Sequence, residues 1–169
     1  MRALLVGVAA VLATAVATIG PAGASTALTL DGSFNTVTVK PQYVPQCPHG
    51  IECGSIELSG FGTADWVYVF GPTFDPIGHC FNVDGTITFT LRSDGSELSG
   101  PLTGVFCPGP SGTAQEQSGT ISYGNPFHED DTITFTTGTG QFAGLTGSAV
   151  FHTFSAGARA RGTLAGTLH

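Results

Sequence analysis

Residues 132–154 read TITFTTGTGQFAGLTGSAVFHTF and raise the first question about the fold. Their GTGQFA segment, residues 138–143, has the spacing of a dinucleotide-binding fingerprint, which requires a helix directly after it to receive the phosphate. A glycine-rich stretch and a β-like run, residues 149–154, follow instead. We therefore predict a tight turn with a bulge, in which glycine supplies positive φ and Phe142 plugs the end of a barrel.

Strand patterns follow one another along the rest of the chain. Apolar residues alternate with polar ones, and Gly, Asp and Pro separate the runs. From Ile56 to Phe70 we expect one long strand, or two joined at Gly60 or Gly62, with the even-numbered face buried. Further strands are expected at residues 28–39, 81–91, 98–106, 112–123, 132–136, 148–155 and 160–168. About eight antiparallel strands predict an all-β fold, a single antiparallel β-barrel, with a β-sandwich as the alternative.

The chain opens with Arg2, an apolar run and the small residues Ala22-Gly23-Ala24, a pattern that predicts a secretory signal peptide over residues 1–24. Residues 25–169 would then be one secreted domain without a membrane span. This domain holds four basic and twelve acidic residues. Such an acidic chain disfavours nucleic acid and anionic membranes as partners.

Four cysteines remain after the signal, and an even number in a secreted chain indicates two disulfides. Zinc is the alternative, but the spacing is not typical of zinc ligands. Asp94-Gly95 favours a hairpin whose paired residue numbers sum to 187 or 189, and a sum of 187 places Cys80 opposite Cys107. We predict Cys80–Cys107 and Cys47–Cys53, the latter around a turn-forming segment.

Residues 138–147, GTGQFAGLTG, resemble the GTGxFxxxxG signature near the end of the allene oxide cyclase and dirigent β-barrel superfamily. The strand rhythm agrees more loosely from Leu28 to Leu168. The resemblance implies an eight-stranded barrel. None of the superfamily's catalytic residues can be matched to a position here, so the resemblance implies no activity for this chain.

Few residues suggest catalysis or metal binding. The sequence has no nucleophile elbow, zinc-protease motif or phosphate-binding loop. Glu129, Asp130 and Asp131 form a candidate calcium loop, but they lack EF-hand spacing, and a solvated acidic loop entering a strand is the favoured interpretation. His79 and His152 are candidate general bases if either meets a carboxylate in the barrel mouth; scaffold histidines are the alternative. We expect no cofactor and no resident metal.

The row Trp66, Tyr68 and Phe70 lies on one face of the long strand. With His152, these rings are our candidates for lining a ligand cavity; plain core is the alternative. The sequence therefore predicts a secreted, disulfide-stabilised barrel, non-enzymatic, that binds a small apolar or amphipathic ligand or an extracellular protein. A cyclase- or isomerase-type enzyme by family analogy, and a structural or interaction domain with a filled core, are the alternatives.

Overall fold

The computed structural model describes residues 27–37, 51–108, 127–156 and 159–169. Over these residues the chain forms nine strands, one short 3-10 helix and no α-helix. The strands are β1 (Leu28–Val37), β2 (Ile51–Leu58), β3 (Gly62–Ile77), β4 (Cys80–Leu91), β5 (Glu97–Pro108), β6 (Phe127–Phe135), β7 (Thr137–Gly138), β8 (Gly147–Ala156) and β9 (Arg159–Leu168). No helix in this part of the chain is long and apolar enough to cross a membrane.

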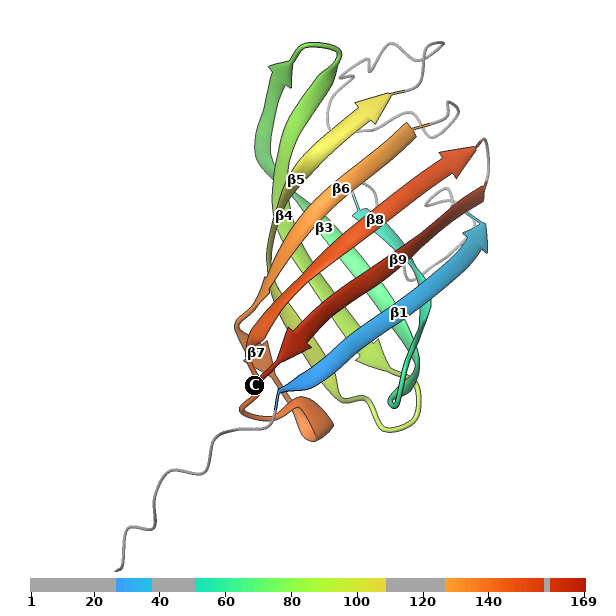
Figure 1. The fold of residues 1–169 in the computed structure, drawn as a ribbon, viewed down its shortest axis with the longest axis vertical. Coiled ribbons are helices and arrows are strands. Elements are labelled where there is room, and N and C mark those ends of the chain that lie inside the picture. Colours follow the sequence, from blue (N-terminus) through green and yellow to red (C-terminus); the bar gives the residue numbers. More distant parts are fainter. Residues whose placement is uncertain (1–26, 38–50, 109–126, 157–158) are drawn as a thin grey trace, which may run out of the picture.

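Eight of the strands close into an antiparallel barrel (Figure 1). The order around the ring is β1–β2–β3–β4–β5–β6–β8–β9, and β9 pairs with β1 to complete it. The remaining strand, β7, has two residues and pairs with β5. The predicted all-β barrel is confirmed, and its closure excludes the β-sandwich. Below, the upper end is the end at which β1, β5 and β8 finish, which is the top of Figure 1.

Alternate residues of each strand face the barrel interior. The even positions of β2 and β3 are buried as predicted, namely Ile56, Leu58, Ala64, Trp66 and Tyr68. Between the two strands the chain turns over residues 59–61, with φ of +81° at Gly60 and +93° at Gly62. Glycine adopts this backbone conformation without a steric penalty. Residues 56–70 therefore form parts of two strands joined at the glycines, which was the second of the two predicted arrangements.

The β4–β5 hairpin has the predicted register. Phe89 lies opposite Leu98 in the ladder, and Cys80 and Cys107 are joined by a disulfide with a Cα–Cα distance of 4.2 Å. The predicted Cys80–Cys107 pair is therefore confirmed. The other predicted pair includes Cys47, which lies outside the described residues, and no described cysteine is free. The expected strand at residues 112–123 and the signal peptide also lie outside them.

The glycine-rich segment closes the lower end of the barrel. Its residues form β7 and a 3-10 helix at Gly140–Phe142, with φ of +55° at Gly140 and +78° at Gly144. The Phe142 side chain is completely buried, and its ring packs in a tilted arrangement 4.9 Å from the Phe61 ring. A strand, β8, follows rather than a long helix. The plugging role of Phe142 is confirmed, and the geometry is not that of a phosphate-binding loop.

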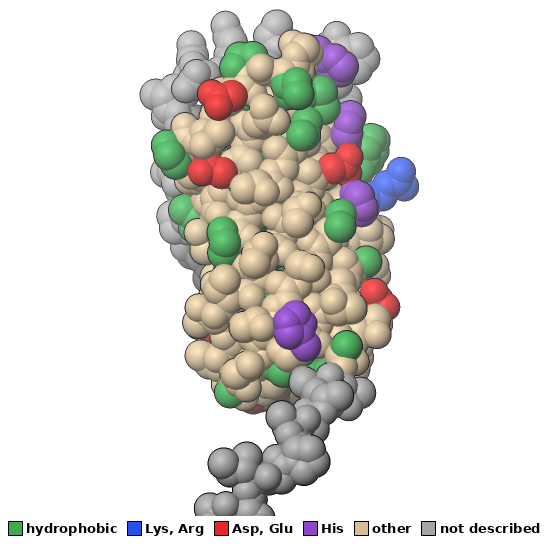
Figure 2. Space-filling view, turned by 60° about the vertical axis from the view of Figure 1, so that its left-hand side comes forward, with side chains coloured by type: hydrophobic (Ala, Val, Ile, Leu, Met, Phe, Trp, Pro, Cys, Tyr) green, Lys and Arg blue, Asp and Glu red, His purple; other side chains and the backbone are tan. Residues whose placement is uncertain are grey.

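Two apolar clusters occupy different heights in the barrel. The larger fills the lower and middle parts, from Phe142 up to Trp66 and Phe151. The smaller consists of Val83, Phe106 and Phe127 near the upper end, with Phe74 and Phe81 packed against it. On the outside, Figure 2 shows hydrophobic and charged side chains scattered among side chains of other types. Between the two interior clusters, polar side chains face the barrel interior.

Candidate functional site in the barrel interior

Three carboxyl side chains lie between the two apolar clusters. Glu52 on β2 is 6% exposed, and Glu129 and Asp131 on β6 are each 1% exposed. We call these three residues the acidic layer. Our prediction of a calcium loop or solvated acidic loop at residues 129–131 is wrong, because these residues belong to strand β6 and only Asp130 faces outward. Strand alternation turns its two neighbours into the interior.

The acidic layer spans the barrel from one wall to the other. In the eight-strand ring, β2 and β6 are separated by three strands on either side, so Glu52 stands opposite the two acidic residues of β6. The backbone ladder fixes the level of each residue. Glu52 pairs with Tyr68, while Glu129 pairs with Phe106 of the upper cluster and Asp131 with Phe151 of the lower one.

Each carboxyl group of the acidic layer has a buried oxygen without a hydrogen-bond partner. These atoms are Glu52 Oε1, Glu129 Oε1 and Asp131 Oδ1, and the indole Nε1 of Trp66 is also buried and unpartnered. A buried polar atom without a partner costs roughly 1–3 kcal/mol. Native proteins leave few of them, and each needs an explanation, such as a site for a ligand or an ordered water.

Burial changes the protonation of the acidic layer. It raises the pKa of Glu52 from 4.5 to about 7. It also raises the pKa of Asp131 from 3.8 to about 8, with further contributions from the negative charges of Glu52 and Asp130. The pKa of Glu129 lies well above 4.5 because of burial and the charges of Asp131 and Glu52. A substantial fraction of the acidic layer is therefore uncharged near neutral pH in the free protein, unlike exposed carboxyl groups.

Glu129 and Asp131 interact directly. The side-chain hydrogen bond between them raises the pKa of Glu129 and lowers that of Asp131. The Tyr68 hydroxyl, which donates to the backbone carbonyl of Asp84 at 3.3 Å, also has its pKa raised, first by burial and then by the charge of Glu129. The site therefore holds several protons in a confined space.

Aromatic rings form the wall next to the acidic layer. Trp66 and Tyr68 are buried, and the Tyr68 ring stacks 4.2 Å from the half-buried Phe70. The three rings that the sequence grouped together therefore share the interior face. His152 does not join them, because the odd positions of β8 face inward and His152 is exposed on the outer surface. The prediction that His152 lines a ligand cavity is therefore wrong.

Glycines give these side chains their space. A Cβ at Gly104 would overlap the Asp131 carboxylate, and a Cβ at Gly85 would overlap the Tyr68 ring. A Cβ at Gly54 would stand 2.9 Å from the indole Nε1 of Trp66. Gly54 follows Glu52 by two positions on the same face of β2, so the unpartnered indole nitrogen lies close to the acidic layer.

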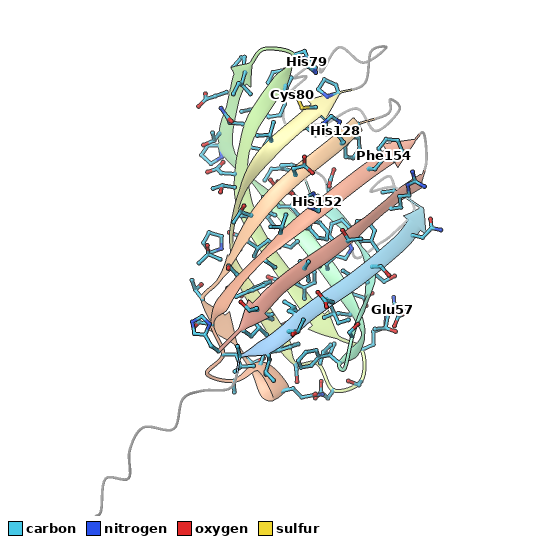
Figure 3. All side chains as sticks on the ribbon, in the orientation of Figure 1. Glu57, His79, Cys80, His128, His152 and Phe154 are labelled. Carbon is cyan, nitrogen blue, oxygen red and sulfur yellow. A yellow bond between two sulfur atoms is a disulfide. The ribbon has the colours of Figure 1, made fainter. Side chains whose placement is uncertain are left out.

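A second polar cluster lies on the outside of the barrel. The Nδ1 atom of His152 is 2.6 Å from Asp130 Oδ1, and Arg161 lies 5.1 Å over the Phe154 ring. These four residues and His128 line a groove of about 450 Å³ over β6, β8 and β9, and Figure 3 labels His128, His152 and Phe154. The side chains of His152 and Asp130 are 55% and 59% exposed. An open ion pair of this kind stabilises a protein little.

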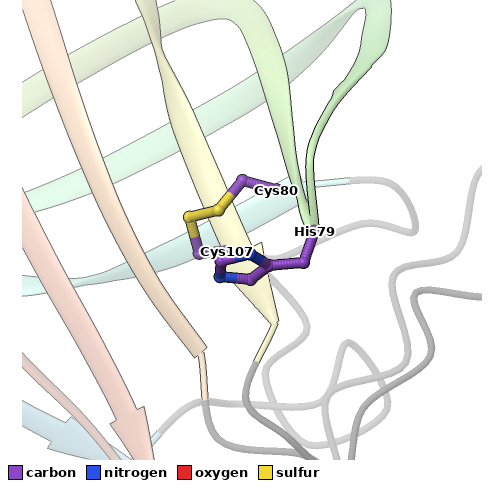
Figure 4. A group of neighbouring side chains, drawn as sticks. All are labelled: His79, Cys80 and Cys107. Carbon is purple, nitrogen blue, oxygen red and sulfur yellow. A yellow bond between two sulfur atoms is a disulfide. The ribbon is translucent and has the colours of Figure 1, made fainter.

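The remaining candidate base, His79, lies beside the disulfide (Figure 4). His79, Cys80 and Cys107 are the one group of three potential metal ligands that lie within 4.8 Å of one another among the described residues. Both sulfur atoms of this group are bonded to each other, so neither is available as a thiolate ligand. The carboxyl groups of the acidic layer do not gather to that distance.

The signal for the acidic layer was present in the sequence as the phase of the strands. Ile133 and Phe135 set the odd positions of β6 inward, and the same phase continued backwards reaches Asp131 and Glu129. The even phase of Ile56 likewise reaches Glu52. The predicted strands start only at Thr132 and Ile56, because charged residues normally mark the solvent face or a loop.

Comparison with known proteins finds no matching family model, no matching curated protein and no matching solved structure. The function is therefore argued from the residues of the acidic layer and its surroundings.

Proposed function

We propose that this protein binds one small amphipathic molecule in the upper part of the barrel, with the polar end of the molecule at the acidic layer. The observation that carries the proposal is the set of four buried polar atoms without partners, on Glu52, Trp66, Glu129 and Asp131. Ligand sites are typically apolar and aromatic cavities with a few convergent polar groups, often with perturbed pKa values. The acidic layer beside Trp66 and Tyr68 has this composition.

The barrel wall supports a route of entry near Glu52. Among the described residues, β1 and β2 are joined at Gly32–Leu58 and Ser33–Glu57. The other edge of β2 pairs with β3 along its whole length, and Glu52 lies beyond the part of β2 that pairs with β1. Parting two strands costs least where few backbone hydrogen bonds join them. A small molecule would therefore reach the acidic layer between β1 and β2 or through the upper end.

Secretion and family membership stay proposals beside the binding function. The Cys80–Cys107 disulfide supports an oxidising compartment, in agreement with a signal peptide at residues 1–24. The eight-stranded barrel with Phe142 as its plug supports the resemblance to the allene oxide cyclase and dirigent superfamily. A shared fold does not carry an activity with it.

A second candidate function is acid–base catalysis in the same place, of a cyclase or isomerase type. The observation in its favour is the pair Glu129 and Asp131, two buried carboxyl groups that interact with each other and have raised pKa values. Raised carboxyl pKa values are typical of general acids. Catalysis would also require a bound substrate, so a binding experiment comes first.

Native mass spectrometry of the purified domain, soaked with a panel of small amphipathic molecules, tests the proposed function. We expect one molecule retained per chain. The variant Thr153→Phe, which places a ring at a buried interior position, should abolish retention, whereas the matched outer variant Thr167→Phe should keep it. Circular dichroism verifies that both variants fold. If the wild-type domain retains nothing from the panel, the barrel is a filled structural domain and the proposal is wrong.

A further inference from the structure

The basic side chains that the structure places, Arg159 not being among them, all lie on the outside of the barrel. Arg92, Arg161, His79, His128, His152 and His169 are each exposed. Arg92 forms an outer ion pair with Asp65. None of these six side chains is a cationic partner of the acidic layer. A carboxylate can be buried in its charged form only with a compensating charge or several hydrogen bonds.

We propose that the ligand of the acidic layer is an organic cation, a primary amine with an apolar body, whose ammonium group lies between Glu52 and Asp131 and beside Trp66. This inference rests on the proposed function and names its ligand class. An ammonium group offers three N–H donors, and Glu52 and Asp131 each present a buried carboxyl oxygen without a partner. The nearby rings of Trp66 and Tyr68 add cation–π attraction in a desolvated site.

A bare metal ion fits the same residues less well. Calcium and magnesium require several oxygen ligands at roughly 2.0–2.6 Å from the ion. Carboxyl groups on opposite walls of the barrel do not assemble into a set of three ligands within 4.8 Å. A hydrogen-bonded ammonium group tolerates longer distances. Its apolar body would pack against the aromatic boundary of the lower cluster, where Trp66 contacts Phe34 and Phe151.

Binding of an ammonium group should release protons. Asp131 is mostly uncharged and Glu52 about half uncharged near neutral pH in the free protein, and a cation between them favours the carboxylate form. The other titratable groups that act on this site are Glu129, Tyr68, Asp84 and Asp130. The elements β1, β5, β8 and β9 face it with Phe34, Gly104, Thr153 and Gly162, which do not titrate. Affinity for the amine should therefore rise with pH.

The single tryptophan of the chain, Trp66, reports on the site by its fluorescence. We would titrate the purified domain with octylamine, octanol and octanoate, three probes with the same apolar body, below their micelle concentrations. We expect octylamine to bind at least tenfold more tightly than the other two, and its affinity to increase by about tenfold from pH 6 to pH 8. In two buffers of different ionisation enthalpy, calorimetry should show proton release.

Two matched variants locate the charge that the amine recognises. Asp131→Asn should weaken octylamine binding by at least tenfold and leave octanol unaffected, whereas Asp130→Asn makes the same chemical change on the outer face and should leave both unaffected. Glu52→Gln provides a second interior variant if Asp131→Asn fails to fold. If octanol or octanoate binds as tightly as octylamine, the cation inference is wrong and interior binding stands. If none of the three changes Trp66 fluorescence, the proposed function fails with it.

Discussion

Asp130 and Asp131 are neighbours in sequence with opposite environments. Asp130 is exposed and faces His152 across the strands, whereas Asp131 is buried and faces Glu52 and Glu129. A one-residue step along a strand reverses the side of the sheet. The pair therefore offers the same chemical substitution inside and outside the barrel.

Asp131→Asn should stabilise the protein at pH 8 by roughly 5 kcal/mol. The pKa of Asp131 is raised to about 8 in the folded state from 3.8. Below pH 3.8 the group is protonated in both states, so no difference arises. As pH rises towards 8, the unfolded state ionises first, and folding loses about 1.4 kcal/mol per pH unit.

Urea denaturation of both variants checks this prediction. Asp130→Asn removes one exposed ion pair and should change the free energy of unfolding by less than about 1 kcal/mol at either pH. At pH 4 the gain from Asp131→Asn should vanish. Equal effects of the two substitutions at pH 8 would show that Asp131 is not a buried acid.

At the scale of elements, the strand patterns were predictable and the acidic ends of two strands were not. Thr132–Phe135 shows the apolar alternation of β6, but the strand begins at Phe127. Likewise, β2 begins at Ile51, ahead of the expected start at Ile56. Pattern analysis uses hydrophobicity to find the buried face, so it fails where a binding site places acids on that face. The pairing of Cys80 with Cys107 could be predicted from the position of the turn alone, because paired residue numbers in a hairpin have a constant sum.

The glycine-rich connection from β7 to β8 is important for stability because of one side chain. Phe142→Ala should lower the free energy of unfolding by roughly 3–5 kcal/mol, since a fully buried ring is lost and a cavity remains. Phe154→Ala is the control, because Phe154 is 42% exposed on the outer face. It should cost about 1 kcal/mol or less. Guanidinium denaturation that ranks the two equally would contradict the role of Phe142 as a plug.

For the whole molecule, the acidic layer makes stability depend on pH in an unusual direction. Its carboxyl groups have folded pKa values above their ordinary ones, so the stability present at pH 4–5 is lost as pH rises through 7 and 8. We expect Tm to fall by about 5–10 °C between pH 5.5 and pH 8.5. Surface carboxylates are already ionised in this range.

The variant with Glu52→Gln, Glu129→Gln and Asp131→Asn separates the acidic layer from the exposed histidines in this experiment. Its Tm should be nearly constant between pH 5.5 and pH 8.5, because the interior acids are gone. The variant keeps the histidines, so any change in Tm that they cause would remain. Scanning calorimetry measures both profiles. A wild-type Tm that is constant or rises over the same range is incompatible with three buried acids.

The central claim is that the barrel holds uncharged carboxyl groups in its interior at neutral pH. Carboxyl ¹³C chemical shifts of the labelled domain, followed from pH 4 to pH 10, measure this directly, with Glu52→Gln and Asp131→Asn assigning the signals. The prediction is a midpoint at about 7 for Glu52 and about 8 for Asp131, with Glu129 also well above 4.5. If every carboxyl carbon of the domain instead titrates below about pH 5.5, as exposed acids do, the acidic layer is solvated and the binding site built on it is contradicted.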